Sequence, residues 1–443
     1  MRSGPQINQN RIKMKNSKDM KEFSGKKLLI LGGTTLSINI VETAKNMGIY
    51  TIVMDMSPDS PTKKVADKAY DISTANVDDV VSIAKQEQVD GIFTSYEDFN
   101  TGIAAEACEK LGLPFYANLY QIDSTRNKLR FKTLCRENGI NVVEEFHLDQ
   151  TFSPDDLAQM QYPVIIKPAD SYAARGISIC YNERELLDAY PHAISFSQTR
   201  QVIVEKYMDG DYVSVTFSIQ NGIVSLSAMN DKAVNEEQQH IVRLPAAYIF
   251  PSKYIDICYK QLLPGLQSLA KQIGLHSGTF SVEAIVTNNR FYIFEMSFRI
   301  GGVNDWKFVL MENGINHMEM YIRYALTGRF EGADLPHQEN PRFRHHYCLL
   351  NVLLRPGLIA KITGAEEITR MPFVFRYAQN YQEGDSVTWP GTLRQIFSKV
   401  FIKADSKEEL LADITTVLQM LKVYDEEGND LVLRNTNIES TIG

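Results

Sequence analysis

The sequence has no long apolar run, no cluster of basic residues in its folded region and few cysteines. Its 443 residues are 44% hydrophobic and 23% charged, with a formal net charge of −8. No apolar stretch approaches the roughly 18–20 residues of a membrane-spanning helix, and the first residues lack the apolar core of a secretory signal, so we expect no membrane partner. The acidic balance argues against nucleic acid as a partner.

The five cysteines are scattered, odd in number and form no CxxC pair. This pattern favours reduced thiols in a cytoplasmic protein over a disulfide framework. Cys348 lies close to His345 and His346, which raises a metal site as an alternative. Because His346 and Cys348 belong to a strand-like run, a structural strand is the preferred interpretation.

Strand and helix patterns divide the chain into four parts. Residues 1–23 are polar and lysine-rich, and we interpret them as a disordered leader. Residues 24–118 alternate short apolar strands with helices, which predicts a doubly wound parallel sheet. Residues 119–330 have an α+β pattern with a small lobe at about 160–210, and residues 331–443 are β-rich. The expected fold class is therefore multidomain, α/β followed by α+β.

The turn at residues 32–35 (Gly-Gly-Thr-Thr) follows the first strand and could be mistaken for a dinucleotide site. Asp55 lies 23 residues after the first glycine, near the position of a ribose-binding acid. The turn lacks the G-x-G-x-x-G pattern, however, so a nicotinamide cofactor is the weaker hypothesis. A substrate-side role around Thr34, Tyr96 and Glu97 is an alternative, and ordinary turn capping is another.

A predicted β-hairpin at residues 278–302 carries two carboxylates among apolar residues. Glu283 lies in its first strand and Glu295 in its second. Burying an unneutralised carboxylate is costly, so a cation between the two acids is the simplest explanation. Mg²⁺ is the preferred cation, because it takes oxygen ligands and shares them with phosphate. Two solvent-facing acids are the alternative.

The loop of this hairpin decides whether the two acids face each other. A two-residue loop would place Glu283 opposite Phe294, with the two acids on opposite faces. A three-residue loop would instead pair Thr287 with Phe291 and set Glu283 across from the second acid. Asn tolerates the left-handed backbone that such loops need. We predict the three-residue loop, or a bulge with the same effect.

Residues before the hairpin suggest a site for a phosphorylated nucleotide. Lys128 begins a predicted helix and Lys167 ends an apolar strand, and two such lysines can hold polyphosphate oxygens. The loop at 171–176 contains small residues whose N–H groups can fold over phosphates. The extended segment 205–208 can bind an adenine edge through its backbone.

Two features follow the second acid of the hairpin. Arg299 lies four residues after Glu295, where a guanidinium can stabilise charge that develops during group transfer. The pair Gly301 and Gly302 allows the chain to approach a ligand closely. Both features favour a catalytic end of the site beyond the acids.

In this order, the motifs resemble those of the ATP-grasp superfamily over roughly residues 25–435, with a pre-ATP-grasp domain before Lys128. The resemblance implies a two-lobed ATP-grasp fold and ATP with Mg²⁺, for which Mn²⁺ can substitute. It also implies the following roles: ATP binding by Lys128, Lys167, Ser171, Gly176, Glu205, Lys206, Tyr207, Met208, Asp211 and His240, metal binding by Glu283, Glu295 and Ser297, substrate contacts at Gly301 and Gly302, and catalysis by Arg299.

The sequence departs from the family pattern at two places. Ser297 stands where family members usually carry asparagine, and a serine is a shorter ligand, which leaves its coordination open. The loop at 171–176 is poor in glycine for a phosphate flap. Within the superfamily, the segment 299–302 and the motifs Arg355-Pro-Gly357 and Tyr381-Gln-Glu-Gly384-Asp are similar to those of L-amino acid ligases.

The resemblance implies an ADP-forming ligase that joins a small-molecule carboxylate to an amine, on amino-acid-like substrates, in the cytoplasm, with a homodimer as one assembly that it allows. Three alternatives stay open. The first is a bicarbonate-activating enzyme, although the acid that biotin carboxylases carry after the arginine is missing from residues 301–304. The second is a nicotinamide-dependent oxidoreductase, and the third is a non-catalytic ATP-binding protein.

Overall fold

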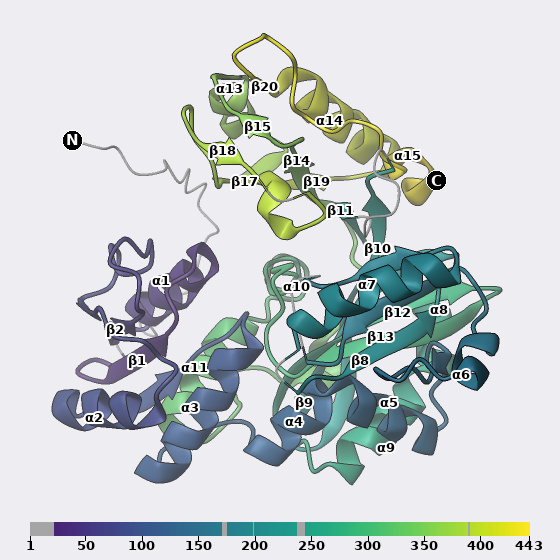
Figure 1. The fold of residues 1–443 in the computed structure, drawn as a ribbon. Helices are drawn as coiled ribbons and strands as arrows, with labels where there is room; N and C mark the ends of the chain where they lie inside the picture. The colour runs from purple at the N-terminus through teal and green to yellow at the C-terminus, as the bar shows by residue number, and fades with distance from the viewer. Residues whose placement is uncertain (1–21, 171–174, 198, 237–243, 389) are drawn as a thin grey trace.

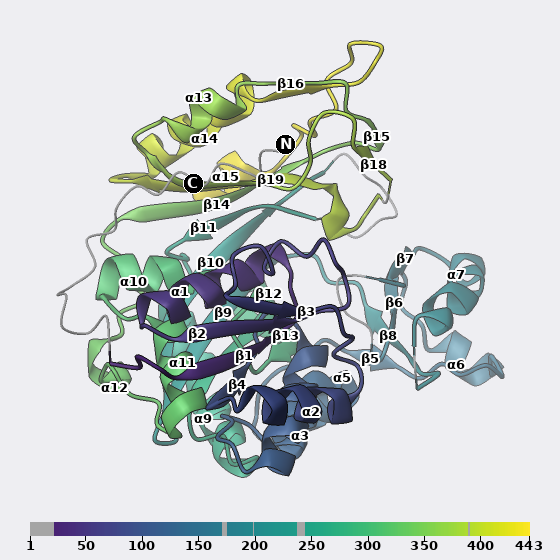
Figure 2. The same ribbon diagram turned by 90° about the vertical axis from the view of Figure 1, so that its left-hand side faces the viewer.

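The computed structural model describes residues 22–170, 175–197, 199–236, 244–388 and 390–443. Figure 1 shows an N-terminal domain (purple and blue) beside a large central sheet, with the C-terminal segment (yellow) above that sheet. Figure 2 shows a small lobe, labelled α6 and α7, that projects from the rest of the molecule. The site described below lies where these parts meet.

The N-terminal domain is a four-stranded parallel sheet in the order β3-β2-β1-β4, which confirms the predicted doubly wound fold. Alternate residues of β1 face two different apolar cores, so both faces of the sheet are covered. One of the helices that cover the sheet comes from a distant part of the sequence, since α11 packs against α1 and β4. The elements are β1 (Lys27–Leu31), α1 (Ile38–Asn46), β2 (Tyr50–Met54), β3 (Lys68–Tyr70), α2 (Val77–Glu87), β4 (Gly91–Phe93), α3 (Asp98–Leu111) and α11 (His317–Thr327).

The large central sheet has eight antiparallel strands in the order β13-β12-β9-β10-β11-β14-β19-β17. Its last three strands come from the predicted β-rich C-terminal part, so this part continues the central sheet. The strands are β9 (Asp211–Gln220), β10 (Ile223–Val234), β11 (Pro245–Phe250), β12 (Gly278–Thr287), β13 (Arg290–Ser297), β14 (His346–Leu353), β17 (Val374–Gln379) and β19 (Ile396–Ala404).

The small lobe is a four-stranded antiparallel sheet in the order β5-β8-β6-β7, with a separate apolar core. Leu186 of α7 packs there on Val164, Ile166 and Val204. Because successive side chains in a strand alternate between faces, Lys167 and Glu205 point away from this core. The elements are β5 (Glu145–Phe146), α6 (Pro154–Ala158), β6 (Val164–Pro168), β7 (Ser178–Cys180), α7 (Glu183–Ser195) and β8 (Val202–Lys206).

The helix predicted to begin at Lys128 does begin there and follows a separate short helix that ends at Arg126. Asn127 is extended at the junction, and its side chain accepts a hydrogen bond from the N–H of Arg130, so a new helix begins at Lys128. The remaining elements are α4 (Leu119–Arg126), α5 (Lys128–Glu137), α8 (Ile255–Gln261), α9 (Leu263–Gln272), α10 (Trp306–Asn313), α12 (Leu335–Gln338), β15 (Gly357–Leu358), β16 (Lys361–Thr363), α13 (Ala365–Thr369), β18 (Ser386–Val387), α14 (Lys407–Met420), β20 (Lys422–Tyr424) and α15 (Ile438–Ile442), with 3₁₀ turns at Thr35–Ser37 and Leu393–Gln395.

The β12–β13 hairpin sets the two acids on one face, but by a different route from the one favoured by the sequence. Asn288 and Asn289, at φ 49° and 57°, form a two-residue loop, so the predicted three-residue loop is wrong. The register then shifts next to Glu283, where Phe294 has no partner, and Glu283 pairs with Glu295. The bulge alternative is therefore confirmed, because one extra residue restores the alignment that the short loop would have lost.

The five cysteines are all buried free thiols. Cys348 lies inside β14, as the strand interpretation predicts, and burial raises the pKa of its thiol. Within the described residues, no group of three or more His, Cys, Asp or Glu side chains is arranged to hold a metal ion. None of the helices described is both long and apolar enough to span a bilayer.

Candidate active site

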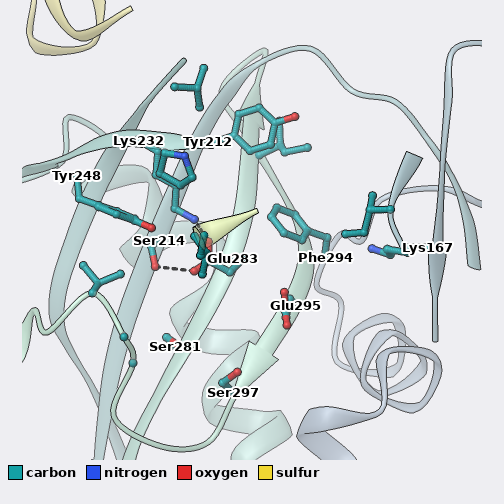
Figure 3. Close-up of a pocket in the computed structure, with 18 of the residues that line it drawn as sticks. Lys167, Tyr212, Ser214, Lys232, Tyr248, Ser281, Glu283, Phe294, Glu295 and Ser297 are labelled. Carbon is teal, nitrogen blue, oxygen red and sulfur yellow. Dashed lines mark hydrogen bonds and ion pairs between the residues drawn. The ribbon is translucent and has the colours of Figure 1, made fainter. Parts of the chain in front are cut away.

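A cavity of about 680 Å³ lies where the small lobe, the central sheet and the N-terminal domain meet. Figure 3 shows side chains of the central sheet and the small lobe that line it. The sequence-predicted residues that it brings together are Lys167, Glu205, Lys206, Tyr207, Met208, Glu283, Glu295, Ser297, Arg299, Gly301 and Gly302. The tertiary fold therefore brings residues between Lys167 and Gly302, which are more than 130 positions apart in the sequence, into the lining of one cavity.

The small-lobe end of the cavity is built around a buried carboxylate held by two lysines. Glu205 is 3% exposed, and its Oε2 accepts a hydrogen bond of 2.7 Å from Lys167 Nζ. Its Oε1 is bound by Lys132 Nζ, which comes from α5 and is fully buried. Burial would raise the pKa of Glu205, but the two ammonium charges outweigh it and hold the pKa below its usual value.

This arrangement fixes Lys167 at the cavity wall. The side chain of Lys167 is held by Glu205 on one side, and its ammonium also lies 5.8 Å from the centre of the Phe294 ring. Glu205 is shared by the two buried lysines, and Glu145 lies 3.2 Å from Lys132 Nζ as a second acidic partner. Lys167 is the lysine of this pair that lines the cavity, so it is the cation that an anion there would meet. Lys132 was missed from the sequence, although it lies four residues after Lys128 on the same face of one helix.

The segment after Glu205 forms an apolar slot with Ile165, Ile177 and Ile179. The N–H groups of Lys206 and Tyr207 already donate to backbone carbonyl oxygens within the protein. Among the described residues, no hydrogen bond engages the N–H of Met208. The N–H groups of Lys206 and Tyr207 are therefore not available to an adenine base. Within the described part of this segment, the N–H of Met208 is the donor that remains available.

The two hairpin acids occupy the middle of the cavity but have different surroundings. Glu283 accepts a hydrogen bond of 2.9 Å from Ser214 Oγ and forms an ion pair with Lys232, as Figure 3 shows for this cluster. Glu295 makes no side-chain hydrogen bond or ion pair with any described residue. Lys232 projects from β10 and its Nζ lies 5.7 Å from the centre of the Tyr248 ring. The unpaired carboxylate is the one that remains available to a cation.

These two carboxylates fit a hard divalent cation in part. Mg²⁺ takes six oxygen ligands and is commonly held in proteins by one or two carboxylates together with phosphate and water. Ser297 follows Glu295 on the same face of β13 and also lines the cavity. The protein therefore offers two acids and a hydroxyl as oxygen donors, fewer than the six ligands that Mg²⁺ takes.

Arg299 lies at the far end of the cavity and is held by the N-terminal domain. Its Nε and one terminal nitrogen donate to the two carboxylate oxygens of Asp98, at 2.7 and 2.9 Å. The backbone on both sides of Arg299 is fixed as well, because Tyr116 donates to the carbonyl of Phe298 and the N–H of Tyr96 donates to that of Ile300. The loop before α3 thus sets the direction of the arginine.

Replacing Asp98 with asparagine (Asp98→Asn) should lower the turnover number by roughly 10–100-fold, the usual cost of losing a supporting contact to a catalytic group. Asparagine cannot accept both guanidinium hydrogen bonds, so Arg299 loses its fixed direction. Nucleotide affinity should stay unchanged, because the side-chain contacts of Asp98 are to Arg299 and not to Lys167 or Glu205. Steady-state kinetics with isothermal titration of ADP checks both. A parallel loss of nucleotide affinity would contradict this role.

Three predicted ATP contacts lie outside the cavity wall. Lys128 is buried at the start of α5. Gly176 packs against Pro168 and Phe196, and a Cβ at this position would lie about 3 Å from both side chains. Close packing within the small lobe therefore explains the glycine. Asp211 is engaged by Tyr254 and by Lys253 Nζ at 3.0 Å, and lines a second hollow. Ser171 and His240 lie outside the described residues.

The turn after β1 is filled by the protein itself. Asp55 accepts a hydrogen bond of 2.8 Å from the N–H of Gly33, and Ser60 donates to the carbonyl of Gly33 at 2.6 Å. A Cβ on Gly33 would lie 1.8 Å from Ser60 Oγ. The glycine makes room for Ser60, not for a pyrophosphate, which disfavours the nicotinamide alternative. Tyr96 and Glu97 do line the main cavity.

Several cavity residues carried no recognisable signal in the sequence. Ser214 alternates with apolar neighbours as any strand residue does, Lys232 follows Asp231 within a strand, and Asp98 is the first residue of a helix. Asp305 is buried, and burial raises the pKa of its carboxyl. It binds Thr216 and caps α10. Each of these acquires its place through a partner distant in sequence.

Comparisons with known proteins agree with this geometry. Residues 127–305 match the family model described as the carbamoyl-phosphate synthase L chain ATP-binding domain, and residues 41–115 match the ATP-grasp N-terminal domain. The formate-dependent phosphoribosylglycinamide formyltransferase of Sulfurisphaera tokodaii is 28% identical over 319 residues, which cover 69% of this chain and 77% of that protein.

Two solved structures share the fold. The L-amino acid ligase of Bacillus licheniformis has a TM-score of 0.75 at 19% identity and covers 91% of this chain and 99% of its own. The biotin carboxylase domain of a 2-oxoglutarate carboxylase from Hydrogenobacter thermophilus has a TM-score of 0.71 at 21% identity. The match covers 94% of this chain and 93% of that domain. The chain belongs to the ATP-grasp superfamily and is an enzyme of that superfamily.

Proposed function

We propose that this enzyme is an ATP-dependent carboxylate–amine ligase that releases ADP and phosphate. The observation that carries the proposal is the linear order of groups along one cavity. Lys167 binds Glu205, which precedes the Met208 segment, and its Nζ lies 5.8 Å from the ring of Phe294, the residue before Glu295. Glu283 is paired with Glu295 across the hairpin, and Arg299 follows four residues later, where Asp98 of the N-terminal domain holds it. This order suits a nucleotide whose terminal phosphate points toward a substrate carboxylate beside the arginine.

The proposed reaction has two steps. A substrate carboxylate oxygen attacks the γ-phosphorus of ATP, the bond to the β-phosphate oxygen breaks, and an acyl phosphate and ADP form. The nitrogen of an amine then attacks the acyl carbon, phosphate leaves with the bonding pair, and the amine loses a proton. Arg299 stabilises the oxyanion that develops in the second step, and Lys167 holds phosphate oxygens.

Glu283, Glu295 and Ser297 are the residues that would hold Mg²⁺, which supplies charge neutralisation for the phosphates when bound. Glu295 is the free ligand of this set, whereas Glu283 must share its carboxylate with Lys232. Lys232 therefore stays close to the phosphates and contributes a second positive charge there. Because the relative from Sulfurisphaera tokodaii is named for its dependence on formate, a carboxylate, it favours the same class of acid substrate for this chain.

A release assay for ADP with all pairs of L-amino acids and Mg²⁺ tests the proposal. We expect at least one pair to raise ADP release well above the rate seen with ATP alone, with the dipeptide detected by mass spectrometry. Bicarbonate in place of one amino acid tests the alternative of a bicarbonate-activating enzyme. ADP release with bicarbonate, and with no pair of amino acids, would contradict the ligase proposal.

A further inference from the structure

The part of the cavity wall next to Gly302 carries two polar side chains from neighbouring strands of the C-terminal part. Asn351 of β14 and Lys399 of β19 are directly opposite each other in the strand register, and both line the cavity. Side chains at such positions have their Cβ atoms roughly 4.5–5.5 Å apart. Lys399 Nζ donates to the carbonyl of Gly302 at 3.3 Å. Gly302 follows Arg299 by three residues, so this contact places Lys399 next to the segment that carries the arginine.

Lys399 has no acidic partner within the described residues. The side chain is recessed in the cavity wall, and burial alone lowers the pKa of its ammonium to about 8. Arg376 of β17 is its diagonal neighbour on the same sheet face, and it also forms no ion pair with a described acid. The arrangement favours a ligand that brings a negative charge.

Asn351 offers the opposite half of a recognition site. The side chain is 3% exposed, and its amide nitrogen donates to the carbonyl of Pro245 at 2.9 Å. That carbonyl can only accept, so the amide orientation is fixed and Oδ1 points elsewhere. Oδ1 is buried and accepts no hydrogen bond from any described residue. A buried acceptor without a donor is destabilising, and a ligand N–H would satisfy it.

We propose that Lys399 and Asn351 bind the amine substrate as an α-amino acid, with its carboxylate on Lys399 and its amino group on Asn351 Oδ1. An α-amino acid carries both groups on one carbon, which matches two side chains that face each other across a strand pair. A phosphate ester or a simple acid would satisfy Lys399 and leave Asn351 unpaired. Val303 and Ile396 in the adjoining wall accept an apolar side chain.

This inference deepens the proposed ligase function and rests on it. It assigns the amine substrate to the end of the cavity next to Gly302, where its nitrogen can approach the acyl carbon beside Arg299. It also makes Lys399 and Asn351 specificity-determining residues, because each contacts substrate and neither contacts the nucleotide.

Isothermal titration of the full chain, saturated with MgADP, tests the site without requiring turnover. The probes are L-amino acids, the matching amino acid amides, the matching acids without the amino group, and ribose 5-phosphate. We expect at least one L-amino acid to bind, and Lys399→Met to weaken it at least tenfold while leaving the amide unaffected. Asn351→Leu should weaken the amino acid about tenfold and leave the acid without the amino group unaffected.

Lys403→Met is the matched control, because Lys403 lies on the same face of β19 but outside the cavity, and it should bind like the wild type. Wild-type affinity in Lys399→Met would overturn the inference, as would binding of ribose 5-phosphate in preference to every L-amino acid, or binding of no L-amino acid at all. Ligase failure is distinguishable: amino acid binding that depends on Lys399 without any ADP release contradicts the ligase proposal and leaves the subsite in place.

Discussion

Replacing Glu295 with glutamine (Glu295→Gln) should lower the rate of ADP release by about 10²–10³-fold at saturating ATP, the scale expected for loss of a preorganised electrostatic contact at transferring phosphate. Glu295 makes no side-chain hydrogen bond or ion pair with any described residue, so the substitution removes a negative charge without breaking a contact that supports the fold. The amide is similar in size and keeps one oxygen, but it binds Mg²⁺ far more weakly than a carboxylate does.

The measurement should separate metal binding from catalysis. Mn²⁺ binding followed by electron paramagnetic resonance, with ADP present, should weaken in Glu295→Gln in parallel with the loss of turnover. Glu426→Gln is a suitable control, because Glu426 is an exposed acid in the C-terminal part. Normal Mn²⁺ binding together with normal turnover in Glu295→Gln would remove this residue from the proposed metal site.

Replacing Lys132 with methionine (Lys132→Met) should lower the free energy of unfolding by about 3–5 kcal/mol, which is the typical cost of removing one partner from a buried ion pair. Lys132 is fully buried and binds Glu205, while its Nζ also lies 3.2 Å from Glu145 Oε1 and donates to the carbonyl of Val143 at 3.2 Å. Methionine fills much of the same volume but leaves the carboxylate of Glu205 with Lys167 as its remaining cation.

Urea unfolding measures this loss. Lys271→Met is the matched control, because Lys271 is exposed on α9 and should change stability by less than about 0.5 kcal/mol. Equal stability of Lys132→Met and the wild type would show that the pair contributes little to folding.

The candidate site was only partly predictable from the sequence. The Lys167 strand end, the 205–208 segment and the acid pair of the hairpin are each local patterns, and the structure brings all of them to one cavity. The hairpin loop was predicted incorrectly because both loop lengths suit Asn288 and Asn289. A bulge at Phe294, which no local rule places, decided the register.

The residues that sequence analysis missed share one property, which is dependence on a distant partner. In the sequence, Asp98 is recognisable only as the start of a helix. It becomes the partner of Arg299 because the N-terminal domain packs against the end of β13. In the sequence, Lys132 cannot be distinguished from other lysines in helices. It becomes part of the site because the small lobe places Glu205 next to it. Lys232 becomes part of the site because β10 and β12 flank β9 in the sheet, which aligns its ammonium with Glu283.

The sequence by itself determined the order of strands and helices, the parallel N-terminal sheet and the presence of two acids among apolar residues in one hairpin. These follow from residue periodicity and from the cost of burying charge, which are local or additive properties. The tertiary structure alone decided which lysines neutralise Glu205, which acid of the hairpin stays without an ion pair among the described residues and which residue holds Arg299. Those depend on strand order and domain packing, because a contact between residues far apart in the chain is fixed only when the whole fold closes around it.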